Sequence, residues 1–257
     1  MSFESRHIID LYSKGFTVVR SALSADTCEN VLEKLRMQQP AHAHSDLAWS
    51  IRSDARILSI FEKAWFTDDL ICSFDNISVS TEHAPPLSWH VDQDGSHIDT
   101  CVCLQGVLAL TGSDVTELAV GSHNAHRNLC RDARRMHWQY VRLTRAQLHE
   151  FATERPQLEA GDLLIWDSRT AHRVARQAAG SMRAVMYLSY VPRVFATSSS
   201  LRERRSFFNK GVCTTHWPHR TVDRGEERIP PSQGYTKAAE SARRLIDGDS
   251  LKGTKVS

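Results

Sequence analysis

Between residues 71 and 192 the chain is a succession of short strand-like segments separated by turns, and this pattern limits the fold more than any other feature. β-Branched and apolar segments occur at 71–80, 100–111, 163–167, 172–176 and 182–191. Turn sequences such as Ala160-Gly161-Asp162 and Ala179-Gly180 separate them. Seven or eight short strands with regular turns are typical of a sandwich or a jelly roll.

Amphipathic helices are expected before these strands. Residues 5–13, 25–37 and 54–64 favour helices, the latter two with apolar side chains at helical spacing, and such helices would pack on the outside of a sheet. The arginine-rich segment 124–154 is predicted to be mostly helical and to interrupt the succession of strands. The prediction is a mostly β (α+β) fold, a double-stranded β-helix or jelly roll with N-terminal packing helices and a helical insert.

The length of 257 residues is normal for one β-rich domain, so a single domain over 1–257 is predicted, with its core at about 71–192. A more polar extension follows at about 197–257, with a helix expected over roughly 236–247. Within the extension, residues 209–219 are rich in polar and aromatic side chains. That stretch either folds over the mouth of a site or packs on the surface.

Composition excludes several classes of protein. The sequence contains no run of eighteen apolar residues, so no membrane span is expected. The N-terminus lacks a basic segment followed by an apolar one, so no signal peptide is expected. The six cysteines show no C-x-x-C spacing, which favours a reducing, intracellular and cytoplasmic setting. A net charge of +2 gives no strong case for a nucleic-acid partner, although it does not exclude one.

Arginine nevertheless outnumbers lysine 25 to 7, and six arginines cluster between residues 127 and 145. They stand beside His137, Trp138 and Tyr140. Two interpretations are open. The cluster is either a solvated surface of the insert or an electropositive lid over an anionic substrate, since the arginine fork matches carboxylate and phosphate groups.

A histidine and a carboxylate, His90 and Asp92, stand two residues apart where a strand leads into a loop. In an extended chain both side chains point to one face, so they can hold one metal ion. A second histidine would complete the two-histidine, one-carboxylate triad that suits Fe(II). A rival pair, His97 and Asp99, runs straight into the strand at residue 100, and the first pair is preferred.

The third ligand should come from a strand that faces His90 across the jelly roll. His172 follows a turn, a buried strand and a second turn, and is therefore the preferred candidate; His123 and His126 are the competitors. Eleven residues beyond His172, Arg183 shares one strand face with apolar side chains. It either reaches water at a strand edge or pairs inside the barrel with a dicarboxylate cosubstrate.

Together these residues resemble the phytanoyl-CoA dioxygenase group of Fe(II)- and 2-oxoglutarate-dependent oxygenases. The resemblance runs from about Gly15 to Pro192. Its motifs are the Gly-Phe-Thr-Val-Val-Arg at 15–20, Trp-His-Val-Asp-Gln at 89–93, Gly-Ser-His at 121–123, Gly-Asp-Leu-Leu-Ile-Trp-Asp-Ser-Arg-Thr-Ala-His at 161–172 and the arginine at 183.

The resemblance implies a role for each matching residue. His90, Asp92 and His172 would bind Fe(II), and Arg183 would hold the distal carboxylate of 2-oxoglutarate. Gln105 and Ser80 would contact the cosubstrate. Members of the group often have a hydroxyl two positions after the distal histidine, where this chain has Val174, and that leaves one cosubstrate contact in doubt.

The implied reaction consumes O₂ and 2-oxoglutarate, releases succinate and CO₂, and hydroxylates an unactivated C–H of a small or medium-sized, anionic organic substrate. Asp92 in the triad disfavours halogenation, which needs that metal position open. Trp89, Trp166 and Arg169 flank the metal motifs and are expected to line the substrate pocket, although Trp166 also fits a core position. Two alternatives remain: the same chemistry on a protein side chain or nucleic-acid base, and a non-catalytic jelly-roll binding protein.

Overall fold

The computed structural model of the chain describes residues 3–37, 43–93, 101–112, 114–131, 135–136, 140–214, 216–219 and 244–247. The chain forms two compact units. Unit 1 comprises residues 1–38 and 78–187, and unit 2 comprises residues 39–77 and 188–257. The expectation of one domain over the whole chain stays a prediction.

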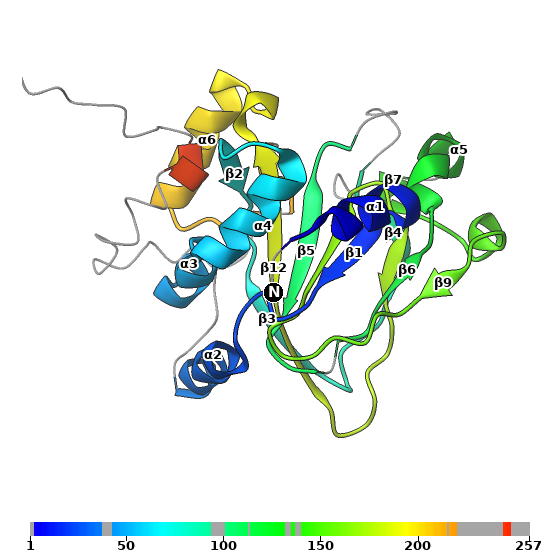
Figure 1. Cartoon of the computed structure of the whole chain (residues 1–257), viewed down its shortest axis with the longest axis horizontal. Coiled ribbons are helices and arrows are strands. Elements are labelled where there is room, and N and C mark those ends of the chain that lie inside the picture. Colours follow the sequence, from blue (N-terminus) through cyan, green and yellow to red (C-terminus); the bar gives the residue numbers. More distant parts are fainter. Residues whose placement is uncertain are drawn as a thin grey trace, which may run out of the picture. The chain divides into compact units, whose positions relative to one another are not determined.

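Unit 1 is built on antiparallel strands in two sheets (Figure 1). The first sheet runs in the order β1–β10–β5–β12, and β3 also pairs with β12. The second sheet has the order β7–β8–β4–β11–β6–β9. The strands are β1 (Phe16–Val19), β3 (Ile77–Thr81), β4 (Leu87–Val91), β5 (Leu104–Ala109), β6 (Thr116–Ala119), β7 (Arg135–Met136), β8 (Tyr140–Arg142), β9 (Thr153–Glu154), β10 (Leu163–Asp167), β11 (His172–Val174) and β12 (Met182–Pro192). The predicted mostly antiparallel jelly roll is confirmed, and it is not a closed barrel.

Apolar side chains from both sheets form the core of unit 1. Val107 of β5, Leu164 of β10 and Val185 of β12 pack in one cluster with Leu118 of the second sheet, and each is at most 1% exposed. Residues two apart on a strand share a face, so these side chains and those two positions away on the same strands face the core. The same inward faces carry the polar residues of the candidate site.

The first strand is fixed by a tight helix end. Helix α1 (Ser5–Lys14) ends at Gly15, whose φ of +88° is left-handed, and β1 begins at the next residue. A Cβ at Gly15 would lie 2.5 Å from Thr170 Oγ1 and 2.6 Å from a His123 ring nitrogen. Only glycine fits both the backbone angle and the space here. Helix α2 (Ala25–Met37) follows β1, as its apolar spacing predicts.

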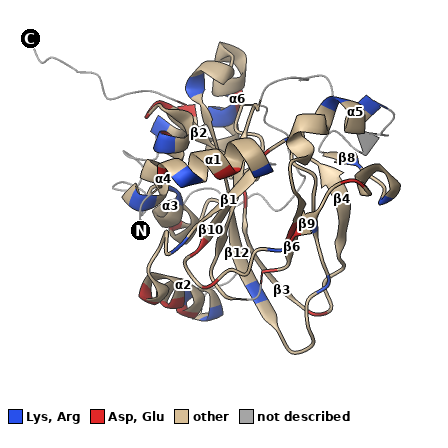
Figure 2. Ribbon diagram, turned by 45° about the vertical axis from the view of Figure 1, so that its right-hand side comes forward, with Lys and Arg blue, Asp and Glu red and all other residues tan. Residues whose placement is uncertain are grey.

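The expectation of a mostly helical insert at 124–154 is wrong. Among its described residues, only α5 (His126–Arg131) and the short 3-10 turns η1 (Ser122–Ala125) and η3 (Ala146–Leu148) are helical, whereas β7, β8 and β9 belong to the second sheet. Val141 and Leu143 are buried and Arg142 is exposed, which is a strand period of two. Arginine-rich composition obscured that period. Basic residues of α5 are seen in Figure 2.

Two predicted strands also differ in their bounds. The strand predicted over 100–111 begins at Leu104 and ends at Ala109. The strand predicted over 71–80 divides into β2 (Leu70–Cys72) and β3 (Ile77–Thr81). Buried apolar runs mark a strand's presence better than its ends.

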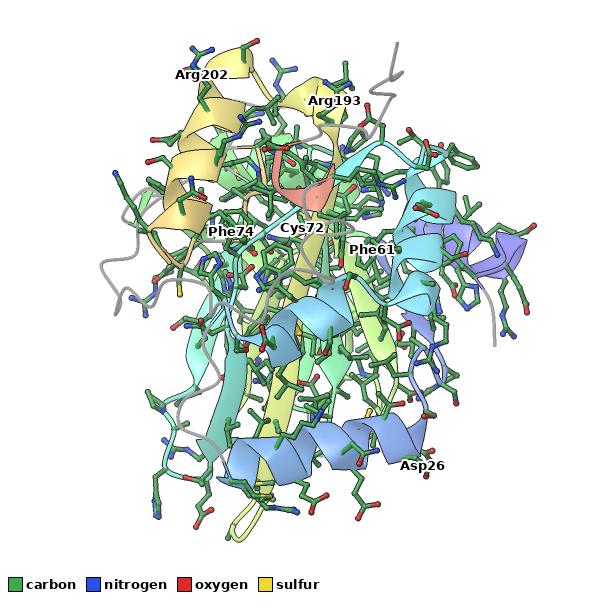
Figure 3. The ribbon with its side chains drawn as sticks, turned by 90° about the vertical axis from the view of Figure 1, so that its left-hand side faces the viewer. Asp26, Phe61, Cys72, Phe74, Arg193 and Arg202 are labelled. Atoms are coloured by element: carbon green, nitrogen blue, oxygen red, sulfur yellow. The ribbon has the colours of Figure 1, made fainter. Side chains whose placement is uncertain are left out.

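Unit 2 gathers helices α3 (Asp46–Arg52), α4 (Ala55–Trp65) and α6 (Ser198–Asn209), the 3-10 turn η4 (Arg193–Phe195) and strand β2, which pairs with β12 from Tyr190 to Pro192. Helices α3 and α6 were not predicted from the sequence. Phe61, Cys72 and Phe74 lie in its interior (Figure 3), and Phe74 contacts the rings of His44, Trp49 and Phe208. Of the helix predicted at 236–247, residues 244–247 are helical and the others lie outside the described residues.

A fully buried arginine ties this unit together. Arg204 of α6 donates to four backbone carbonyls, those of Ile246 (2.7 Å), Pro218 (2.6 Å), Cys72 (2.6 Å) and Leu245 (3.0 Å). Burial lowers the pKa of this guanidinium to about 10, so it remains charged at neutral pH. One side chain therefore satisfies acceptors on three separate segments.

No helix in the described part of the chain is long and apolar enough to cross a membrane. All six cysteines lie among the described residues, and no disulfide bond joins any two of them.

Substituting Arg204→Met should destabilise the protein by about 3 kcal/mol or more, because each buried carbonyl left without a donor costs about 1–3 kcal/mol. The free energy of unfolding in urea measures the effect. Arg202→Met, two positions earlier on the exposed face of α6 (Figure 3), is the matched control and should change it by less than about 0.5 kcal/mol. Equal unfolding midpoints for the two variants would refute the structural role of Arg204.

Candidate metal centre

Two histidines and an aspartate converge inside unit 1. Strands β4 and β11 are antiparallel neighbours with His90 directly opposite His172, and Asp92 follows the end of β4. Asp92 Oδ1 lies 3.8 Å from His90 Nε2, and Asp92 Oδ2 lies 3.4 Å from His172 Nε2. One ligand atom from each residue falls within 4.8 Å of the others, and all three side chains are buried. The three predicted metal ligands therefore come together.

Backbone carbonyls orient both imidazoles. His90 Nδ1 lies 2.7 Å from the Ser88 carbonyl, and His172 Nδ1 lies 3.0 Å from the Thr170 carbonyl. A carbonyl oxygen only accepts hydrogen bonds, so each Nδ1 carries the proton and each Nε2 keeps its lone pair. Metal-binding histidines are typically held this way through their other nitrogen. Two imidazole nitrogens and one carboxylate oxygen are a donor set that fits Fe(II) with open positions.

A buried amide fixes the loop that carries Asp92. Gln93 is fully buried; its backbone N–H donates to the Ser168 carbonyl at 3.0 Å, and its side-chain oxygen accepts from the Ser168 hydroxyl at 2.7 Å. His126 contributes a ring nitrogen 2.6 Å from the Gln93 carbonyl. These bonds link the residue after Asp92 to the turn before His172, so they set the distance between the two ligands.

The competing ligands have other partners. His126 bonds the Gln93 backbone, and His123 Nε2 lies 3.0 Å from the Tyr12 carbonyl. Burial lowers the pKa of His123, and the bond to Tyr12 only partly opposes that shift, so the ring is neutral at pH 7. Neither histidine belongs to the cluster. The rival pair His97 and Asp99 lies outside the described residues.

Arg183 points into the interior from β12 and is 3% exposed. Its Nε donates to Asp114 Oδ1 at 2.7 Å, and Nη1 lies 3.3 Å from the Tyr187 hydroxyl. Nη2 is 2.7 Å from the same carboxylate oxygen but makes no hydrogen bond within the described part of the chain. Burial lowers the pKa of the guanidinium, while Tyr187 and Asp114 raise it by more, so Arg183 stays charged.

Two further polar groups are buried in the same interior without partners among the described residues. Gln105 of β5 is 2% exposed, and neither its side-chain oxygen nor its nitrogen is hydrogen-bonded. Trp166 stands opposite it on β10, with an unpaired indole N–H and its ring 5.0 Å from that of His172. Unpaired buried polar groups cost stability, so they mark a place where a polar ligand compensates.

Ser80 reaches Arg183 indirectly. Its hydroxyl lies 3.0 Å from the Gln177 side-chain amide. With the amide turned to satisfy its neighbours, Gln177 donates to Ser80 and accepts from the Arg183 backbone N–H at 3.1 Å. Gln177 therefore links Ser80 to the backbone of Arg183, the predicted carboxylate-binding arginine. Ser80 is not part of the metal cluster.

The remaining two predicted substrate residues lie elsewhere. Trp89 packs in a separate apolar cluster with Val91 and Leu143, beneath the Arg173 guanidinium at 5.1 Å. Arg169 makes a fork to the Asp167 carboxylate, with Nη2 to Oδ2 at 2.7 Å and Nε to Oδ1 at 3.0 Å. The structure does not bring either one into the triad, and their contact with substrate stays a prediction.

Two residues near the site were missed from the sequence. Asp114, whose side chain is fully buried, balances Arg183 across 69 residues, and no local pattern signals such a pair. Tyr140 of β8 packs its ring 5.1 Å from that of His90. Its alternation with Val141 and Arg142 was the available signal, and the helical interpretation of the insert concealed it.

The chain has the jelly-roll fold of the 2-oxoglutarate-dependent oxygenases, with a two-histidine, one-carboxylate cluster inside it. The epimerase SnoN, solved with Fe³⁺, alpha ketoglutarate and nogalamycin RO, superposes with a TM-score of 0.59 at 18% identity over 74% of this chain and 83% of SnoN. GIG2 (GlcNAc Inducible Gene 2) of Candida albicans gives a TM-score of 0.73 at 12% identity, covering 100% of this chain and 79% of GIG2.

Two sequence comparisons also give matches. A family model described as Gig2-like matches residues 128–244. Ava biosynthesis cluster protein O of Aspergillus versicolor is 26% identical over 202 residues, 70% of this chain. The match spans 65% of that relative's length. The expected likeness to Fe- and 2-oxoglutarate-dependent enzymes is confirmed at the level of fold, whereas the phytanoyl-CoA dioxygenase group is not named by any of these matches and stays a prediction.

Replacing His172 with alanine should weaken Fe(II) binding more than about 100-fold, because loss of a mere hydrogen-bonding partner of a ligand already costs about 10–100-fold. Anaerobic titration of the purified chain with Fe(II) measures the affinity. His149→Ala removes an imidazole that is 72% exposed and outside the cluster, and it should bind as the wild type does. Undiminished binding by His172→Ala would overturn the ligand assignment.

Proposed function

We propose that this protein is an Fe(II)- and 2-oxoglutarate-dependent dioxygenase that hydroxylates an unactivated C–H of a small or medium-sized, anionic organic substrate. One observation carries the proposal: the Nε2 lone pairs of His90 and His172 converge with the Asp92 carboxylate in a buried interior. That donor set leaves metal positions open for a chelating cosubstrate and O₂. The bound metal, 2-oxoglutarate and O₂ would supply the oxidising chemistry, with release of succinate and CO₂.

The residues of the chain bind and orient these groups. His90, Asp92 and His172 are the proposed metal ligands. Arg183, held from one side by Asp114, keeps Nη2 free of hydrogen bonds within the described residues and is the proposed partner of the distal 2-oxoglutarate carboxylate. The amide of Gln105 and the indole N–H of Trp166, which have no hydrogen-bond partner among the described residues, are the proposed polar contacts beside it.

The surroundings favour a dry reaction site. Val107, Leu118, Leu164 and Val185 surround the interior with apolar atoms. Exclusion of water strengthens the electrostatic contacts of Arg183 and limits side reactions. Asp92 would bind the metal through its carboxylate and leave no position there for a halide, so halide transfer is not proposed. The preference for an anionic substrate rests on the arginine-rich composition of segment 127–145, which contains six arginines.

The reaction class is tested by supplying Fe(II), 2-oxoglutarate and O₂ under ¹⁸O₂ with a panel of small organic acids and phosphates. We expect succinate formation coupled to a product heavier by one oxygen atom, and both signals lost in His90→Ala. Succinate formation without ¹⁸O in the product would show that the reaction is not a hydroxylation but another type, such as the epimerisation named for SnoN. Absence of succinate above the His90→Ala background across the panel would reject the proposed function.

Changing Arg183 to alanine should raise the KM for 2-oxoglutarate about 100-fold, since two charge-assisted hydrogen bonds contribute about 3 kcal/mol and each 1.4 kcal/mol is tenfold. Arg183→Lys keeps a charge near Asp114 but loses the fork, so an intermediate increase is expected. Steady-state succinate formation at varied 2-oxoglutarate gives the values. Thermal unfolding of both variants shows whether they remain folded without the native Arg183–Asp114 ion pair, so that a change in KM is not caused by unfolding. An unchanged KM in folded Arg183→Ala would exclude the proposed contact.

A further inference from the structure

A groove of about 630 Å³ opens on unit 1 where β4, β8 and β11 lie side by side. A volume of this size accommodates a metabolite-sized ligand. Its lining is unusual because four of twelve residues are arginines: Arg142 and Arg145 from β8 and the following turn, and Arg173 and Arg176 from β11 and the segment after it. Trp89, Leu87 and Val174 contribute apolar surface between them.

Three of these four positive charges lack a carboxylate partner. Arg142, Arg145 and Arg176 are exposed and form no ion pair within the part of the chain that the structure describes. Arg142 instead donates to the hydroxyl of Ser88 at 3.2 Å. Only Arg173 is balanced, by Glu117 at 2.6 Å. Like charges gathered in one concave place repel each other, so the groove favours an occupant with at least two negative charges.

The fourth arginine is part of the groove's construction. Arg173 lies over the Trp89 ring at 5.1 Å, a cation–π distance, and Trp89 is 7% exposed. Beneath it, Val91, Val141 and Leu143 form the separate apolar cluster of this face. The floor is therefore rigid, and arginine guanidinium groups stand around it. Such an arrangement suits an anionic ligand with an apolar body.

This groove is distinct from the metal centre. None of His90, Asp92 or His172 lines it. Trp89 directly precedes His90 and Arg173 directly follows His172, and neighbouring side chains on a strand point to opposite faces. Trp89 and Arg173 therefore lie on the face opposite the metal ligands. Arg142, which pairs with His90 across the sheet, and Ser88 lie on the ligand face, so the groove reaches both faces near the paired ends of β4 and β11 but contains none of the three ligands.

We infer that this groove is a second binding site, which takes a small organic ligand bearing two or more phosphate or carboxylate groups. Planar guanidinium forks match both kinds of anion. Anion binding in the groove can be measured without the proposed oxygenase reaction, because neither the three candidate metal ligands nor Arg183, Gln105 and Trp166 line it.

The test uses the full chain freed of metal, titrated calorimetrically with inorganic pyrophosphate and, separately, with citrate at low and moderate salt. We expect saturable binding of at least one probe that weakens with salt, and a loss of about tenfold or more in Arg145→Ala/Arg176→Ala. Arg155→Ala, an exposed arginine outside the groove, is the matched control and should bind normally. The stronger probe distinguishes a phosphate from a carboxylate ligand.

His172→Ala separates the two sites. Unchanged pyrophosphate or citrate affinity in this variant supports a separate groove, whereas its loss would assign the anion to the metal centre and overturn the inference. Failure of both probes to bind the wild type would also overturn it. So would a single-stranded oligonucleotide that binds more tightly than either probe and depends on the same two arginines, because the site would then be a nucleic-acid surface.

Discussion

The pairing of β4 with β11 is the interaction on which the candidate centre depends. It sets His90 opposite His172, and the strand-end carbonyls of Ser88 and Thr170 then fix both rings with Nε2 inward. Residues that are 82 positions apart in sequence become a metal site only through this register. A slip of one residue would turn one imidazole to the other face of the sheet, where Trp89 and Arg173 now lie.

Much of this arrangement could be predicted from sequence because it is local or periodic. His90 and Asp92 are two residues apart on an extended segment, and the strand of Leu163 to Asp167 is a continuous buried run. The apolar spacing of residues 25–37 and 54–64 likewise predicted α2 and α4. Such patterns reflect one face of one element, and one sequence suffices to read them.

What escaped prediction depends on contacts between distant segments. Asp114 is a plain acidic residue in sequence, and only the fold shows that it balances Arg183. The strand β8 was concealed because arginine tolerates both helix and strand, and pairing with the edge of β4 decided the outcome. Helix α6 was missed for a related reason: its polar surface carries little hydrophobic periodicity, and its place is fixed by Arg204 through carbonyls of remote segments.

Burial of charge follows one rule at two places in the chain. Arg204 donates hydrogen bonds to four backbone carbonyls, so its guanidinium needs no anionic partner. Its role is therefore structural. Arg183 is buried to a similar degree, yet Asp114 binds it through a single oxygen, and Nη2 stays without a hydrogen bond among the described residues. Such a cation is expensive for folding alone, and so are the buried polar groups of Gln105 and Trp166 in the same core, which have no partner among the described residues. A dianionic ligand that enters this interior would remove that cost, and this difference between the two arginines is why Arg183 is assigned to the cosubstrate and Arg204 to the fold.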